Sequence, residues 1–261
     1  MLEPDPNHPL HNIEEMYALF EPSDELDIKV AKDIGPNKKS LVVVDNFYKY
    51  PDKVREFTLK REKLSDPKLL SYLPGVRVFC PTRCVQMRTK HIFTELCFDK
   101  EIWGREFNRD VYEDEWDKAG YMANVINDVT LLRSPDGIIP HQDTYETEWP
   151  NMPAQFGAVI YLNTPEECQG GTNLWSFDGT MSLKGKGPTG IVKSDEDATE
   201  EEVFGSIHKQ LYETSDRWKV EHEIEMVYNR MALYEADNLH SQNVDLGMFT
   251  DYDRVNQVLF M

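Results

Sequence analysis

The sequence is poor in basic residues relative to acidic ones. Its 261 residues include 28 lysines and arginines against 47 aspartates and glutamates, and the formal net charge is −19 at pH 7. Binding to the phosphates of nucleic acids or to an anionic membrane surface requires clustered positive charge. We therefore expect no nucleic-acid partner and no membrane partner for this chain.

Cysteines are also few, and long apolar runs are lacking. The 4 cysteines are irregularly spaced, and no second cysteine pair joins Cys80 and Cys84 to complete a zinc site. No apolar run approaches the length that spans a membrane, and the N-terminus lacks a basic segment followed by an apolar one. We expect reduced thiols and a cytoplasmic protein.

The first 120 residues show mixed patterns. Residues 1–37 begin with a proline-rich, acidic stretch, and we expect them to form an arm that lies on the surface. The β-branched run 41–44 predicts a buried strand, and the segments 52–63 and 91–116 predict helices. We interpret residues 1–120 as an arm, a strand and helical support that pack on the core that follows.

From residue 121 onward the pattern becomes β-rich. Apolar runs and alternations predict strands at 122–132, 138–143, 154–163, 172–177, 218–227, 230–235 and 254–260. Many strands after a helical N-terminal part indicate a mainly β fold with flanking helices. We expect residues 121–261 to form a double-stranded β-helix, the jelly roll shared with cupins, and the whole chain to be one structural domain.

Residues 178–217 interrupt the predicted strands. They contain an acidic run and a segment with apolar residues at helical spacing, and a lone helix of that length must dock on something to be stable. We expect this insertion to cover the mouth of a site or to form a subunit contact in a homodimer. The alternative is a helix on the outer wall with no functional role.

A pattern typical of metal ligands stands early in the β-rich part. In His141-Gln142-Asp143, the side chains at i and i+2 of a strand project from the same face. His141 and Asp143 can therefore reach one metal ion while Gln142 points the other way. Two histidines and one carboxylate are the ligands of non-haem Fe(II) oxygenases. Taken alone, the tripeptide is a weak signal, because such pairs also occur at surface turns.

A third ligand must come from another histidine. His208 lies in the helical segment of the insertion, and His222 lies among apolar strand residues, where a histidine is usually packed in a core. His240 follows the strand 230–235, at a position from which a side chain can point into the mouth of a barrel. Arg254 opens the last strand, and inside an apolar barrel it would need an anion, because an unpaired buried charge is costly. At the rim it would face water.

These residues resemble a known family, the Fe(II)- and 2-oxoglutarate-dependent dioxygenases, and most of all their prolyl-hydroxylase-like branch. The resemblance covers about residues 121–261 and rests on His141-Gln142-Asp143, Tyr161-Leu162-Asn163, Gly170-Gly171-Thr172, His240 and Arg254. It implies that His141, Asp143 and His240 hold iron. It also implies that Arg254 and Tyr161 bind the far carboxylate of 2-oxoglutarate, and that the Gly-Gly-Thr turn is structural. The long interval between Asp143 and His240 departs from compact members, and the insertion accounts for it.

The resemblance implies a reaction with Fe(II), 2-oxoglutarate as cosubstrate and O2. An unactivated C–H bond of a small molecule, an amino acid or a peptidyl residue would be hydroxylated, with release of succinate and CO2. The presence of Asp143 counts against halogenation, because related halogenases lack this carboxylate. Two alternatives stay open: a cupin-like metal-dependent isomerase, which would not need Arg254, and a catalytically silent jelly-roll binding module, which would tolerate loss of ligands.

Overall fold

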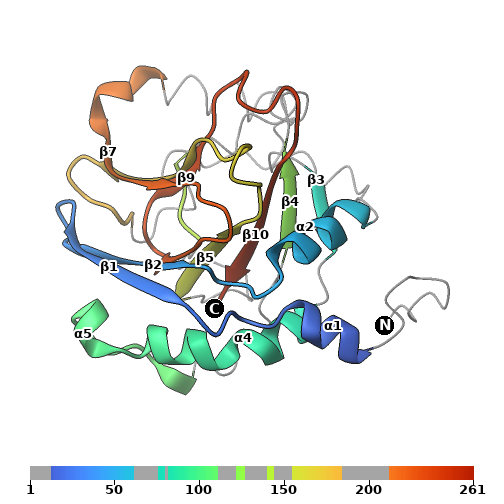
Figure 1. Cartoon of the computed structure of the whole chain (residues 1–261). Coiled ribbons are helices and arrows are strands. Elements are labelled where there is room, and N and C mark those ends of the chain that lie inside the picture. The colour runs from blue at the N-terminus through green and yellow to red at the C-terminus, as the bar shows by residue number, and fades with distance from the viewer. Residues whose placement is uncertain are drawn as a thin grey trace, which may run out of the picture.

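Two antiparallel sheets form the core of the protein (Figure 1). The computed structural model describes residues 13–61, 76–79, 82–110, 122–126, 140–143, 155–183 and 212–261. The larger sheet consists, in spatial order, of β1 (Asp27–Ile34), β2 (Lys39–Asp45), β8 (Met231–Glu235), β5 (Phe156–Tyr161), β10 (Arg254–Phe260), β4 (Met122–Ile126) and β3 (Val76–Phe79). The smaller sheet consists of β7 (Trp218–Glu225), β6 (Gly171–Phe177) and β9 (His240–Asn243).

The chain passes repeatedly from one sheet to the other. After β4 in the larger sheet, His141 forms an antiparallel bridge with His240 of β9 in the smaller sheet. Then β5 lies in the larger sheet, β6 and β7 in the smaller, β8 in the larger, β9 in the smaller and β10 in the larger. This is the path of a double-stranded β-helix, and the predicted mainly β, jelly-roll fold is confirmed.

Helices lie along the larger sheet on the side opposite the smaller one (Figure 1). They are α1 (Ile13–Leu19), α2 (Pro51–Lys60), α4 (Thr82–Cys97) and α5 (Lys100–Trp103), and a 3-10 turn, η2 (Ser215–Arg217), precedes β7. Pro51 suits the start of α2, because the first turn of a helix needs no partner for its backbone N–H groups. The helix predicted at 52–63 is observed as α2, and the one predicted from residue 91 belongs to α4 and α5.

Side chains along the strands alternate between two layers. In β5, Phe156, Ala158 and Ile160 join the apolar cluster beneath the helices, whereas Val159 and Tyr161 join the cluster between the two sheets. A strand imposes this alternation, because successive side chains point to opposite faces. The layer between the sheets therefore receives every second residue of β5, and the predicted site residue Tyr161 is one of them.

Two predictions about the N-terminal and connecting segments need correction. We expected residues 1–37 to be a surface arm, but residues 27–34 form β1, which pairs with β2. Most β1 side chains are exposed at this edge of the sheet, and its sequence therefore lacks the apolar pattern of a buried strand. Within the predicted strand 138–143, the described residues 140–143 contain a single bridge at His141 rather than a continuous strand.

Several predicted features lie outside the described residues. These are residues 1–12, the end of the strand predicted at 122–132, the end of the helical segment 91–116 and the helix predicted within 178–217. The division into a supporting part, 1–120, and a core, 121–261, stays a prediction. Among the described helices, none has both the length and the apolar character needed to cross a lipid bilayer.

Candidate metal centre

His141, Asp143 and His240 lie together between the sheets. One potential ligand atom from each residue lies within 4.8 Å of the others. Two backbone hydrogen bonds join the histidines, one of 2.8 Å from the His141 N–H and one of 2.7 Å from the His240 N–H. This pairing brings the two imidazole rings to a centroid separation of 4.4 Å. Two segments that are far apart in the sequence thus present their side chains to one point.

Backbone carbonyl groups of the turn between β8 and β9 orient two of these three residues. The Ala236 carbonyl accepts a hydrogen bond of 2.8 Å from the Asp143 N–H. The Asn238 carbonyl lies 2.9 Å from Nδ1 of His240. A carbonyl can only accept, and this contact therefore places the proton of a neutral His240 on Nδ1 and leaves Nε2 as the metal-binding nitrogen.

The Asp143 carboxylate lies close to both imidazoles. Its Oδ1 is 3.9 Å from His141 Nε2, and its Oδ2 is 3.4 Å from His240 Nε2. Oδ2 is buried and has no hydrogen-bond partner among the described residues. Burial lowers the pKa of His240, which favours the neutral imidazole that binds metals. A buried carboxylate oxygen without a donor needs a cation, and this group can hold a metal ion.

Gln142 points away from the metal group, as its place between His141 and Asp143 predicts. Gln142 is buried on the other side of the segment, where its Oε1 accepts a 3.0 Å hydrogen bond from the Leu183 N–H. The His141 side chain is 33% exposed, against 9% for that of His240, and the group therefore opens to solvent on the His141 side. His222 lies half-buried on β7, opposite Leu174, and is not part of the group.

Arg254 is buried in the same space between the sheets. Its Nη1 donates to Gln242 Oε1 at 2.9 Å and to Asn256 Oδ1 at 2.7 Å, and its Nη2 donates to the Gly171 carbonyl at 3.3 Å. These acceptors are neutral, and Nε has no partner among the described residues. Burial lowers the pKa of the guanidinium to about 10, which leaves it charged at neutral pH. Because the described residues offer this buried cation no carboxylate, it can serve as a site for an anion.

Tyr161 lies beside this guanidinium. The Arg254 guanidinium carbon is 5.7 Å from the centre of the Tyr161 ring, and the Tyr161 hydroxyl shares a 2.7 Å hydrogen bond with Thr172 Oγ1. Burial raises the pKa of Tyr161, which keeps its hydroxyl neutral and able to donate. The structure therefore places Arg254 and Tyr161 together in the interior, and the alternative of a water-facing Arg254 at the rim is wrong.

Sequence reasoning missed some neighbours of these residues. Thr172, which we expected only to be structural, contacts Tyr161, and Gln242 contacts Arg254. The two residues lie opposite each other on β6 and β9, and their polarity gave no sign of these contacts. Tyr234 on β8 was not singled out. Its ring centre is 4.8 Å from that of His240, and the charges of Asp143 and Arg254 both act on its hydroxyl. Tyr234 thus packs against the metal group and lies near enough to the buried guanidinium to interact with its charge.

The Gly170-Gly171 turn has the structural role that we expected. Both residues have positive φ, of 67° and 147° respectively. A side chain on Gly170 would collide with the backbone of Asn243, and one on Gly171 with the backbone of Ile224. Glycine is therefore required for the close approach of the three strands of the smaller sheet, and this approach brings the Gly171 carbonyl to Arg254.

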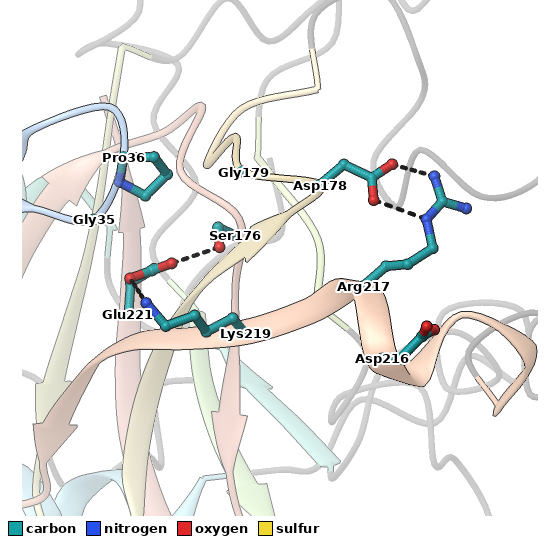
Figure 2. A pocket seen from close by; sticks show the side chains of 9 residues that line it. All are labelled: Gly35, Pro36, Ser176, Asp178, Gly179, Asp216, Arg217, Lys219 and Glu221. Atoms are coloured by element: carbon teal, nitrogen blue, oxygen red, sulfur yellow. Dashed lines mark hydrogen bonds and ion pairs between the residues drawn. The ribbon is translucent and has the colours of Figure 1, made fainter.

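A separate shallow groove of about 630 Å³ contains none of the predicted site residues (Figure 2). It is lined by Gly35, Pro36, Ser176, Asp178, Gly179, Asp216, Arg217, Lys219 and Glu221. Asp178 and Arg217 form an ion pair across it, and a backbone hydrogen bond of 3.1 Å joins the same two residues. They are the two ends of the predicted insertion 178–217, which thus leaves and rejoins the core at one place.

The fold and this group of side chains define a class, a jelly-roll protein whose interior can hold a metal ion. The chain belongs to the family of unknown function DUF6445, which matches residues 26–254. No curated protein sequence is significantly similar to it. One similar solved structure is that of a novel N-substituted L-amino acid dioxygenase from Burkholderia ambifaria AMMD. That chain is 13% identical, the TM-score is 0.37, and the match covers 85% of this chain and 82% of the other. This likeness is too distant to carry an argument about activity.

Proposed function

We propose that this protein is an Fe(II)- and 2-oxoglutarate-dependent dioxygenase that hydroxylates an unactivated C–H bond. One observation carries the proposal: the interior that contains the His–Asp–His group also contains Arg254, which is 1% exposed and has only neutral described acceptors. A metal-ligand group alone suits several activities. A buried guanidinium near it requires an anionic partner as well, and 2-oxoglutarate supplies both a metal-binding 2-oxo acid and a second carboxylate.

The three ligand residues fit Fe(II). Two neutral imidazoles and one carboxylate with open coordination positions are typical of iron oxygenases. When bound, iron would supply coordination positions for the 2-oxo acid and for O2, and the redox chemistry that converts 2-oxoglutarate to succinate and CO2. The contribution of the chain is to hold His240 in the tautomer that binds through Nε2 and to keep the Asp143 carboxylate close to Nε2 of both rings.

Arg254 and Tyr161 fit the far carboxylate of 2-oxoglutarate. A planar guanidinium can bind a carboxylate at two points. Gln242 and Asn256 hold the guanidinium through amide oxygens, and they fix its orientation without neutralising its charge. The Tyr161 hydroxyl would add one hydrogen bond. A cupin-like isomerase or a silent binding module has no need of a buried arginine that no described carboxylate neutralises, and this residue therefore favours the oxygenase over both alternatives.

The proposed substrate is a small molecule, an amino acid or a peptidyl residue. It would approach from the His141 side, where the metal group is most exposed. Dimer formation through the insertion 178–217, and its action as a cover over the site, stay predictions, because residues 184–211 lie outside the described part of the chain.

Succinate formation tests the proposal. The protein is incubated with Fe(II), 2-oxoglutarate and O2, alone and with a panel of free amino acids, peptides and cell extract. We expect slow Fe(II)-dependent conversion of 2-oxoglutarate to succinate, and faster conversion with a suitable substrate. Samples with Zn(II) in place of Fe(II) serve as the control. Absence of Fe(II)-dependent succinate under every condition, together with absence of 2-oxoglutarate binding, would contradict the proposal.

A further inference from the structure

Gly157 lies in the middle of β5, where glycine is an unfavourable choice. It pairs with Tyr234 of β8 and with Phe260 of β10. Its φ is not positive, and its backbone conformation is open to any residue. Glycine weakens the interior of a strand, because it loses more conformational freedom on folding and has no side chain to pack. The backbone of β5 therefore gives no reason for glycine at this position.

The space around Gly157 gives a reason. A Cβ atom on this residue would lie 3.0 Å from Asp143 Oδ2 and 3.0 Å from Tyr234 Cε2. Ordinary van der Waals contacts begin at 3.4 Å. A methyl group at this position would therefore have to displace both the carboxylate and the ring, each by a few tenths of an ångström (about 0.4 Å).

One of these neighbours, Asp143, is a member of the metal group, and the other, Tyr234, packs against it. Asp143 Oδ2 is the oxygen that lies 3.4 Å from His240 Nε2. The Tyr234 ring packs against the His240 ring at a centroid separation of 4.8 Å. Metal–ligand distances are specific to within about 0.2 Å, and a displacement of about 0.4 Å is therefore larger than a metal site tolerates.

The geometry points to Gly157 as a positioning residue of the metal site. The absence of its side chain leaves the room in which the Asp143 carboxylate and the Tyr234 ring take the positions that suit metal binding. This inference rests on the proposed function and adds β5 to the elements that shape the site. Without metal, the carboxylate can rotate away from an added methyl group, and only the contact with the edge of the Tyr234 ring is left for the fold to absorb.

The test compares Gly157→Ala with Val159→Ile. The control adds a methyl group to the same inner row of β5, two positions further along, within the apolar cluster between the sheets. Two quantities are measured for each protein: the Tm without metal, and the affinity for Fe(II) by anaerobic calorimetry. For Gly157→Ala we expect a metal-free Tm close to that of the parent, because the lower chain entropy of alanine offsets the contact with Tyr234, and a loss of Fe(II) affinity of about tenfold or more. For Val159→Ile we expect parental Fe(II) affinity and a Tm lowered by overpacking.

Each other outcome overturns a defined part of the account. Equal Fe(II) affinity in Gly157→Ala and the parent would overturn the role of Gly157 alone. A metal-free Gly157→Ala protein that is unfolded or less stable than Val159→Ile would do the same, because glycine would then serve the fold. An equal loss of affinity in Val159→Ile would show general crowding instead of a specific contact. A parent protein that binds no Fe(II) would overturn the proposed function itself.

Discussion

Both faces of the larger sheet bury apolar side chains, but only the inner face also buries the described charged residues of the candidate site. On β10, Val255 and Leu259 point to the layer beneath the helices, whereas Arg254 contacts Gln242 of the smaller sheet. The outer face gains stability from apolar burial. The inner face buries an apolar cluster together with a cation and several polar groups, and burial of polar groups costs stability unless each group finds a partner. Neighbouring residues of one strand thus have different roles, and substitutions on the two faces should have different effects.

The largest effect should follow from removal of a ligand on the inner face. Asp143→Ala, His141→Ala or His240→Ala should each abolish Fe(II)-dependent succinate formation while the fold survives, because each removes one of three metal ligands. Iron content, succinate formation and circular dichroism measure the effect. His222→Ala is the matched control and should retain iron. Undiminished hydroxylation by Asp143→Ala would contradict the assignment.

Loss of the buried guanidinium should separate cosubstrate binding from metal binding. Arg254→Ala should weaken 2-oxoglutarate binding on the order of a hundredfold or more and leave Fe(II) affinity largely unchanged. The reason is that it removes one partner of a charge pair in a desolvated pocket. Tyr161→Phe should have a milder effect, because it removes one hydrogen bond and keeps the ring. Calorimetry with 2-oxoglutarate measures both, and unchanged affinity in Arg254→Ala would separate this residue from cosubstrate binding.

A substitution on the outer face should have the opposite signature. Leu259 is fully buried beneath the helices, and Leu259→Ala should lower the free energy of unfolding by about 2–5 kcal/mol through lost burial and a cavity. The Fe(II) affinity of the folded protein should stay at the parental level. Urea denaturation and calorimetry measure the two quantities. A loss of iron binding without a loss of stability would remove the distinction between the faces.

The smallest effect should come from an ion pair at the end of β2, which contributes to neither face. Arg230 contacts Asp45 at 2.6 Å and 3.0 Å and lowers the pKa of this carboxyl below its ordinary 3.8. The stabilisation is therefore present above pH 3.8 and is lost as the pH falls through the lowered pKa of the folded state. Asp45→Asn should cost about 1–2 kcal/mol at pH 7, and this difference should shrink below pH 3.8. Urea denaturation at several pH values checks the sign, and a difference that grows in acid would contradict it.

Much of the core and of the site could be predicted from local patterns. The strands β5, β7, β8 and β10 were predicted from alternating or continuous apolar residues, and each is observed as a strand. The spacing of His141 and Asp143 dictates that both side chains share a face, and Gln142 turns away as expected. The choice of His240 depended on its place after a strand, and the structure brings this histidine to the other two residues.

Other features depend on contacts that no local pattern encodes. β1 has mostly exposed side chains, and its strand conformation comes from backbone pairing with β2. The Ala236 and Asn238 carbonyl groups orient Asp143 and His240, but a carbonyl is present in every residue and leaves no trace in the sequence. The importance of Gly157 becomes visible only when β5 is seen to lie against Asp143.

The central claim is that the interior binds iron and 2-oxoglutarate together. Addition of 2-oxoglutarate to the anaerobic Fe(II) protein tests it most directly, because chelation of the metal by a 2-oxo acid produces a weak visible charge-transfer band. We predict this band for the parent protein, its absence in Asp143→Ala, and a much higher 2-oxoglutarate requirement in Arg254→Ala. A parent protein that is saturated with Fe(II) and 2-oxoglutarate but shows no band would contradict the claim.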